Sequence, residues 1–195
     1  MTRGHHHSDQ LDLPITGGWG GSRSGAGRRK SGRRVGVPHR RRPIHKARHP
    51  VHATLRSAID RLRDARVFPV LRNALGSASC SGFRIVHFSV QPNHVHLLVE
   101  AHDTDTLCRG MRRLAIRTAL RVNKVLGRRG PVWTDRFHLH ELQAPREVRN
   151  CLNYLLQNWK KHVEGAAGLD PCSSGQWFDG WRHLDDGTQP CLPSP

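Results

Sequence analysis

Apolar and polar positions alternate in some parts of the chain and recur every three or four residues in others. Alternation, or a run of β-forming residues, predicts strands over 51–55, 83–90, 94–100 and 132–142. Apolar rows at helical spacing predict helices from Pro69 to about 78, over 103–126, and from Pro145 to about 162. The turn residues Gln91-Pro92-Asn93 join the second and third strands in a hairpin. The capping-box spacing of 57–60 predicts a short helical turn after the first strand.

The order of these elements predicts the fold class. Strand, helix, strand, strand, helix and strand match the split βαβ arrangement, which is an antiparallel sheet covered on one face by two helices. We therefore expect an α+β, ferredoxin-like domain with one extra C-terminal helix. The helix over 103–126 is expected to face the sheet with the row Leu107, Met111, Leu114, Thr118, Val122 and Val125.

Composition limits how much of the chain can fold. Only 36% of residues are hydrophobic, and residues 1–50 hold 12 of the 32 Lys and Arg but 2 of the 15 Asp and Glu. A segment with so few apolar side chains cannot offset the entropy cost of ordering. We expect a disordered basic tail over 1–47, a folded domain over 48–165, and a C-terminal extension over 166–195. This extension is expected to be anchored by Trp177, Phe178 and Trp181, for which packing on the domain is the favoured interpretation and contact with DNA the alternative.

Charge narrows the classes of partner. The formal net charge is +17 and the pI is about 11.4, which favours polyanions over acidic proteins or neutral small molecules. No run of about 18 apolar residues predicts a transmembrane helix, and the N-terminus has no apolar signal core. Five cysteines without a C-x-x-C pair indicate a reduced, cytoplasmic protein.

The sharpest local feature is His94-Val95-His96 in the third predicted strand. Side chains two apart on a strand lie on the same face, about 7 Å apart along the strand. Two imidazoles arranged in this way can bind one divalent cation, while Val95 faces the core. Two partly exposed histidines on a sheet surface are the alternative interpretation.

The second feature is Tyr154, the only tyrosine in the chain. It lies outside the apolar row of the last predicted helix and shares a polar face with Asn150, Asn158 and Lys161. The Asn158 amide oxygen can ligate a metal, and Lys161 can neutralise a phosphate. A phenol with a pKa of about 10 attacks a phosphodiester poorly unless a cation polarises the phosphate. An exposed tyrosine without a chemical role is the alternative.

These segments together resemble a known family. Residues 92–99 (PNHVHLLV) are similar to the corresponding segment of HUH-superfamily single-tyrosine transposases, in particular the REP-associated tyrosine transposases. Residues 154–158 (YLLQN) resemble the tyrosine helix of that branch, and 132–137 (VWTDRF) resemble the strand before it. The resemblance covers about 50–163. The sequence departs from it after Asn158, where Trp159 replaces the usual proline.

The resemblance implies an activity. Members cut single-stranded DNA at or near hairpins, so Tyr154 would form a covalent 5′-phosphotyrosine and release a 3′-OH that later rejoins strands. His94 and His96 would hold Mg²⁺ or Mn²⁺, with Asn158 as a third ligand. The protein would act in the bacterial cytoplasm, associated with the nucleoid, as a monomer or homodimer. Tyr154 could act with the histidines of its own chain or with those of a partner.

Further DNA contacts are expected from cationic side chains. The helix over 103–126 carries an arginine row at every fourth position, with no Asp or Glu along it: Arg109, Arg113, Arg117 and Arg121. Dense like charge favours a row that contacts phosphates, although a solvated helix face is the alternative. Arg136 and Arg149 are expected to contribute nearer the site.

The sequence is also compatible with two other functions. The first is a non-catalytic basic protein that holds nucleic acid on the same fold. The second is a hydrolytic zinc enzyme that uses His94 and His96 with Cys108 or Cys151, although neither H-E-x-x-H nor paired cysteines are present.

Overall fold

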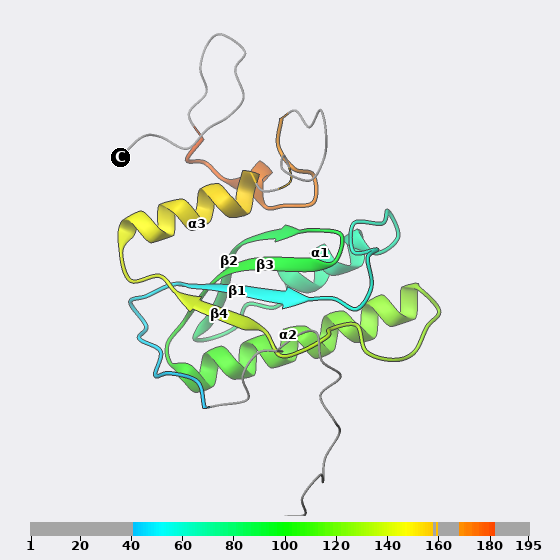
Figure 1. Cartoon of the computed structure of the whole chain (residues 1–195), viewed down its shortest axis with the longest axis horizontal. Coiled ribbons are helices and arrows are strands. Elements are labelled where there is room, and N and C mark those ends of the chain that lie inside the picture. The colour runs from blue at the N-terminus through cyan, green and yellow to red at the C-terminus, as the bar shows by residue number, and fades with distance from the viewer. Residues whose placement is uncertain (1–40, 158, 160–167, 182–195) are drawn as a thin grey trace, which may run out of the picture. The chain divides into compact units, whose positions relative to one another are not determined.

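The computed structural model describes residues 41–157, 159 and 168–181 of the chain. Within these ranges four strands form one antiparallel sheet in the order β2-β3-β1-β4. The strands are β1 (Val51–Arg56), β2 (Phe83–Val90), β3 (His94–Ala101) and β4 (His138–Glu141). The α-helices are α1 (Phe68–Gly76), α2 (Thr104–Val125) and α3 (Pro145–Gln157), and a 3-10 turn spans Gly175–Trp177. The predicted α+β class is therefore confirmed (Figure 1).

Alternation along the central strands sorts the two faces of the sheet. Val95, Leu97 and Val99 of β3 point to the core that α1 and α2 cover. Leu98 points to the opposite face, where it joins a second cluster with Leu155 of α3. The sheet thus lies between two helices on one side and α3 on the other (Figure 1). The predicted α2 row is confirmed, since its residues from Leu107 to Val122 are buried.

Two predicted elements differ from the structure. Residues 57–60 form a bend rather than a helical turn, because the Ser57 hydroxyl accepts a bond from the Ile59 N–H and donates one to the Val132 carbonyl. The predicted strand over 132–142 is shorter, and only 138–141 pair regularly with β1. Residues 132–134 still pair singly with the end of β1, through a bridge between Trp133 and Ser57, before 135–137 interrupt the strand. The Trp133 indole N–H donates to the Ala115 carbonyl of α2, 2.9 Å away.

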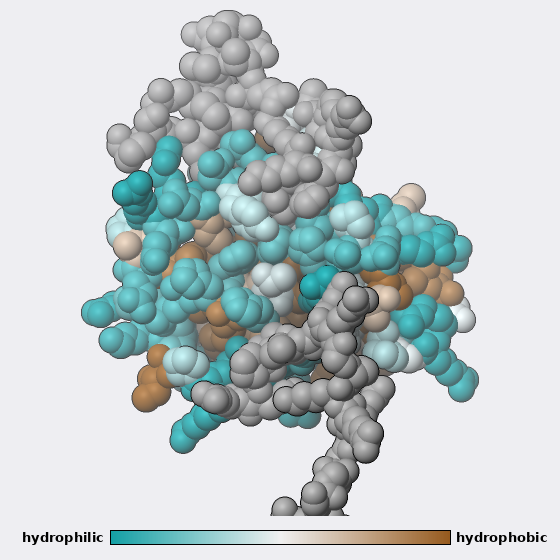
Figure 2. All heavy atoms as spheres, in the orientation of Figure 1, coloured by the Kyte–Doolittle hydropathy of each residue, from teal (hydrophilic) through white to brown (hydrophobic). Residues whose placement is uncertain are grey.

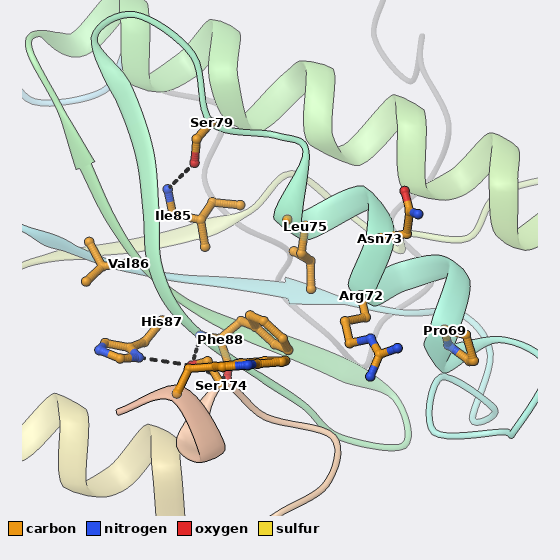
Figure 3. Close-up of a pocket in the computed structure, with 12 residues that line it drawn as sticks. Pro69, Arg72, Asn73, Leu75, Ser79, Ile85, Val86, His87, Phe88 and Ser174 are labelled. Carbon is orange, nitrogen blue, oxygen red and sulfur yellow. Dashed lines mark hydrogen bonds between the residues drawn. The ribbon is translucent and has the colours of Figure 1, made fainter. Parts of the chain in front are cut away.

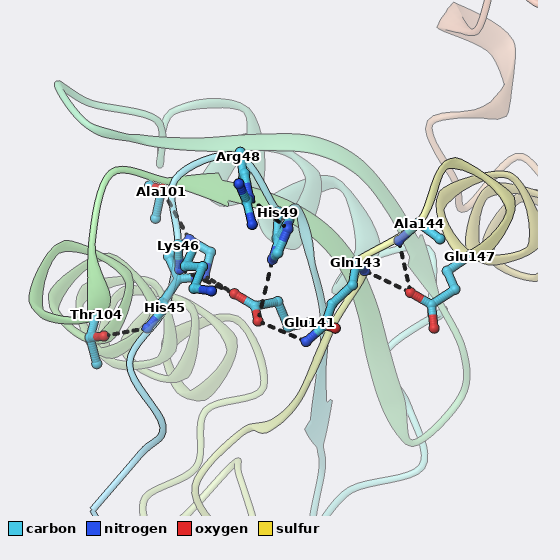
Figure 4. A network of polar contacts seen from close by, with 10 residues as sticks. All are labelled: His45, Lys46, Arg48, His49, Ala101, Thr104, Glu141, Gln143, Ala144 and Glu147. Carbon is cyan, nitrogen blue, oxygen red and sulfur yellow. Dashed lines mark hydrogen bonds and ion pairs between the residues drawn. The ribbon is translucent and has the colours of Figure 1, made fainter.

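The segment before β1 is packed earlier than composition predicted. His45, assigned to the disordered tail, is buried, with its ring nitrogens 3.1 Å from Glu141 Oε1 and 3.0 Å from the Ala101 carbonyl. The Lys46 backbone N–H donates to the same Glu141 carboxylate (Figure 4). The partner Glu141 is 96 residues away in sequence from His45, so the tail composition did not reveal this contact. The rest of the predicted tail, 1–40, lies outside the described residues.

The C-terminal extension is bound to the domain by polar and apolar contacts. Asp170, which is 1% exposed, accepts two bonds from the Arg63 guanidinium at 2.7 and 2.9 Å. Trp181 is buried and donates from its indole to the Gly175 carbonyl, and Phe178 packs in the same cluster. Trp177 differs from the expected packing, since 59% of its side-chain surface is exposed.

No helix in the ranges that the structure describes is both long and apolar enough to cross a lipid bilayer.

The contact between α2 and β2 predicts a stability effect. A Cβ at Gly110 would lie 2.3 Å from the Phe83 ring, which is almost fully buried. Gly110→Ala should therefore lower the free energy of unfolding by about 1–3 kcal/mol through overpacking, measured by chemical denaturation. Gly76→Ala is the matched control, because a Cβ there meets no atom within 4 Å. Equal stability of the two variants would show that Phe83 can move aside.

Candidate active site

The predicted tyrosine and histidines meet within one chain, on the face of the sheet that α3 covers. The Tyr154 hydroxyl lies 3.4 Å from His96 Nε2, and the two ring centroids are 5.1 Å apart. His96 is 5% exposed and Tyr154 39% exposed, so the phenol lies at the border between the buried imidazole and solvent. The structure thus gives an arrangement in which Tyr154 is beside the histidine of its own chain.

The two histidines of β3 share this face, as their spacing predicts. Their ring centroids are 4.7 Å apart, while Val95 between them is 2% exposed in the opposite core. His94 Nδ1 lies 2.7 Å from the Asn93 amide oxygen, so the turn that precedes β3 also orients the first imidazole.

Helix α3 determines where the tyrosine lies. Cys151, Leu155 and Leu156 are buried against the sheet, and Tyr154 stands beside this apolar row rather than in it. The helix begins at Pro145, and the Glu147 carboxylate accepts bonds from the backbone N–H groups of Gln143 and Ala144. These bonds lower the pKa of Glu147 and hold the start of α3 directly after β4.

Two polar neighbours of His96 come from β1 and were not singled out in the sequence. His52 Nε2 lies 3.1 Å from His96 Nδ1, and the Thr54 hydroxyl lies 3.2 Å from the same nitrogen. Thr54 is directly opposite His96 in the β1–β3 register. Alternation in 51–55 does place His52 and Thr54 on one face, but only the strand pairing brings that face to His96.

Strand β4 adds two more imidazoles to the same face. His138 lies opposite Thr54 and His140 opposite His52. Burial lowers the pKa of His52, and the neighbouring His140 and His138 lower it further. His52 is therefore neutral at pH 7, with one ring nitrogen that donates and one that accepts.

The contacts of His96 Nδ1 fit the tautomer in which Nε2 is the acceptor. A hydrogen bond between two ring nitrogens needs one donor and one acceptor. When His96 donates from Nδ1 to His52 or Thr54, its Nε2 carries the lone pair and faces the Tyr154 hydroxyl. The β1 residues can thus orient His96 as a ligand or as a hydrogen-bond acceptor.

The two imidazoles of β3 fit a divalent cation whose remaining coordination positions are filled by other ligands. His94 and His96 offer two imidazole nitrogens from positions two apart on one face of β3. The described residues contain no group of three or more His, Cys, Asp or Glu side chains that could hold a metal. Additional ligands would come from an amide oxygen, water or substrate. The predicted third ligand Asn158 and the predicted phosphate contact Lys161 lie outside the described residues.

The geometry does not favour the zinc alternative. Cys108 packs against the core between the sheet and α1–α2, on the face opposite His94 and His96. Cys151 is in the cluster under α3, where burial raises the pKa of its thiol to about 11. A thiol with so high a pKa provides little thiolate for a metal.

The predicted arginine row and Tyr154 lie on opposite sides of the sheet, because α2 covers one face and α3 the other. Arg117 donates to the Ser77 carbonyl at 2.9 Å, Arg121 to the Asn73 amide oxygen at 3.0 Å, and Arg113 lies 3.8 Å from Cys80 Sγ. The row therefore runs along α1 and the segment after it. Phosphate contact by the row stays a prediction, now at a surface separate from Tyr154.

Arg136 lies in the segment before β4. Burial lowers the pKa of Arg42, and the charge of the nearby Arg136 guanidinium lowers it further. Arg42 itself lies over the Phe137 ring at 4.0 Å. These two arginines concentrate positive charge at the start of the strand that carries His138 and His140.

Comparisons with solved structures give the fold. The chain is similar to a REP-associated tyrosine transposase solved with a REP hairpin, with 20% identity, a TM-score of 0.53, and coverage of 65% of this chain and 74% of the other. It is also similar to a protein from Deinococcus radiodurans R1 described as a transposase, with 18% identity, a TM-score of 0.39, and coverage of 67% of this chain and 100% of the other. No curated protein matches the chain.

A family model covers the site itself. The model described as "Transposase IS200 like" matches residues 39–158, which is more than half of the chain. The match begins before β1 and ends after Tyr154, so it includes the strand with both histidines and the helix with the tyrosine. The chain therefore belongs to the IS200-like transposase family, as its resemblance to HUH-superfamily transposases predicted.

Proposed function

We propose that this protein cleaves single-stranded DNA at hairpin or repeat-associated sites and rejoins strands through a covalent 5′-phosphotyrosine on Tyr154. The observation that carries the proposal is the 3.4 Å distance between the Tyr154 hydroxyl and His96 Nε2 within one chain. Membership of a transposase family supports the reaction class. The REP hairpin bound by the structural neighbour supports hairpin DNA as the substrate class.

The chemistry is a transesterification that conserves the phosphodiester. Tyr154 Oη gives up its proton and attacks the scissile phosphorus, the bond from phosphorus to the 3′ oxygen breaks, and that oxygen leaves as a 3′-OH after taking up a proton, so no net proton is gained or lost. The 5′ phosphate stays on Tyr154. A 3′-OH then attacks this phosphotyrosine, which reforms a phosphodiester and returns the phenol. The number of ester bonds is unchanged, so no nucleotide cofactor is consumed.

The chain's own residues position the reaction. His94 and His96, with Asn158 as the proposed third ligand, would hold Mg²⁺ or Mn²⁺, which polarises the scissile phosphate when bound. His52 and Thr54 keep His96 Nε2 directed to the phenol, and the buried row of α3 keeps Tyr154 Oη at this spot. Preorganisation of this kind avoids reorganisation during the attack.

The cationic surface would hold the DNA. The net charge of +17 attracts phosphates, and Arg136 and Lys161 are the proposed contacts nearest the site. The proposed setting is the bacterial cytoplasm, at the nucleoid, with the protein as a monomer or homodimer. In the arrangement described here, Tyr154 acts with the histidines of its own chain.

The alternative is a protein of the same fold that binds nucleic acid without cleaving it. The convergence of His94, His96 and Tyr154 favours catalysis, because binding alone does not require a phenol beside two imidazoles.

Tyr154→Phe should abolish covalent attachment, because the phenylalanine ring has no nucleophilic oxygen. The protein is incubated with a labelled single-stranded hairpin and Mn²⁺, and adducts are detected by denaturing electrophoresis. Wild type should give an adduct that EDTA prevents. Wild-type protein that binds the hairpin with salt sensitivity but never forms an adduct would support the non-catalytic alternative instead.

His94→Ala should abolish cleavage and leave most of the DNA affinity, because affinity comes mainly from arginines elsewhere. Cleavage rate and equilibrium binding are measured on the same hairpin. Arg136→Ala is the complementary variant, and it should weaken binding more than it affects cleavage at saturating DNA. A His94→Ala protein that no longer binds DNA would contradict this division of roles.

His52→Ala should weaken Mn²⁺ binding about tenfold, since His96 loses a partner that orients it. Mn²⁺ affinity is measured by titration calorimetry without DNA. His138→Ala is the matched control, because this histidine shares the face but has no described bond to His96. His52→Gln, which can still hydrogen-bond, should recover part of the affinity. Equal Mn²⁺ affinity of His52→Ala and wild type would show that His52 does not position the ligand.

A further inference from the structure

A second recess lies apart from the Tyr154 site, between α1, the edge strand β2 and the 3-10 turn Gly175–Trp177. It encloses about 660 Å³. Figure 3 shows Arg72 and Asn73 of α1 on one side, with His87 and Phe88 of β2 and Ser174 on the other. None of His94, His96 or Tyr154 lines it. The recess is therefore a separate surface for which the proposed chemistry has no use.

One wall of the recess is aromatic. Trp177 lines it and is 59% exposed, whereas Trp181 of the same extension is buried. The Phe88 and Trp177 ring centroids are 6.3 Å apart. An exposed indole beside a second aromatic ring offers a flat face on which a planar group can stack.

The exposed tryptophan is held in place rather than lying on a loose tail. The backbone N–H of Trp177 donates to the Ser174 carbonyl at 3.1 Å, and the backbone N–H of Ser174 donates to the Phe88 carbonyl at 2.9 Å. The Ser174 hydroxyl also accepts from the Phe88 N–H. The backbone of Trp177 is thus tied through Ser174 to β2, which lowers the entropy cost of binding a ligand on this residue.

The rim of the recess is cationic. Arg72 lines it, and no Asp or Glu is among its lining residues, all of which lie in the described ranges. Asn73, another lining residue, accepts a bond from Arg121, and Arg117 donates to the nearby Ser77 carbonyl. The arginines of the α2 row therefore reach α1 and the residue after it, but none of them lines the recess. The positive lining charge comes from Arg72, and it favours an anionic occupant.

The edge of β2 argues against a peptide strand as the occupant. Its outward backbone donors are already used: the Ile85 N–H donates to Ser79 Oγ, the Phe88 N–H to Ser174 Oγ, and the Val90 N–H to the Cys172 carbonyl. A peptide that added to this edge would need those donors free.

We propose that this recess binds one unpaired nucleotide of single-stranded DNA, with its base stacked on Trp177 and its phosphate beside Arg72. An aromatic platform next to cationic side chains is the chemistry that recognises single strands without strong sequence preference. The proposal rests on the proposed function in taking DNA as the substrate. It adds a contact that holds an unpaired part of the DNA away from the site of cleavage.

The test compares two labelled DNAs on the full-length protein: a hairpin with a single-stranded flank and the same hairpin with a blunt end. Trp177→Ala should weaken binding of the flanked hairpin about tenfold and leave the blunt hairpin unchanged. Trp177→Phe should retain most of the affinity, because its ring still stacks. Arg72→Ala should reduce the salt dependence of flanked-hairpin binding by about one counterion.

Leu120→Ala is the matched control, since Leu120 is an exposed apolar residue outside the recess. Equal affinity of Trp177→Ala and wild type for the flanked hairpin would overturn the proposal. So would an equal loss for both DNAs, with thermal unfolding of the variant unchanged. The assay measures binding only, so it gives an answer even if the wild-type protein forms no tyrosine adduct; that separate result would overturn the proposed cleavage and leave the nucleotide site standing.

Discussion

The packing of α3 across the outer face of β3 is the constraint on which the candidate active site depends. Leu155 and Leu156 are almost completely buried, and they share a cluster with Leu98 of β3. Tyr154 is covalently next to Leu155, and His96 is two residues from Leu98 on the same face. Once these leucines pack, the phenol and the imidazole have little freedom to separate. An apolar contact thus creates a polar site.

The sheet separates the candidate catalytic residues on one face from the arginine row on the other. On the α3 side, imidazoles of β1 and β3 lie beside the Tyr154 phenol, which suits bond making and breaking at a phosphate, and β4 adds two histidines to the same face. The α1–α2 side carries the arginine row, and the β2 edge carries Trp177 with Arg72. In this view the large positive charge is not one diffuse field. In the proposed function, these surfaces would contact different parts of one DNA molecule.

Much of the fold was predictable because the local patterns are strong. Val95 between two histidines, the α2 row from Leu107, and Pro145 at the start of α3 each point to one structure, and each was found. The predictions that differ from the structure concern segments in which a partner distant in sequence overrides the local preference. The predicted strand over 132–142 is interrupted at 135–137, next to Trp133, whose indole bonds to α2, and His45 is ordered because Glu141 is beside it. Neither partner is near in sequence.

The sequence alone determined the chemistry available: a lone tyrosine, a His-x-His strand and a strongly basic chain, since residue type and two-residue periodicity follow from the chain itself. Only the tertiary structure decided which groups meet. The β1–β3 pairing brought His52 and Thr54 to His96, and helix packing brought Tyr154 to the same imidazole. The packing of α2 placed the arginine row on the side of the sheet opposite Tyr154. Side-chain alternation is a local property of the backbone, whereas strand order and helix docking depend on contacts between residues far apart in the chain.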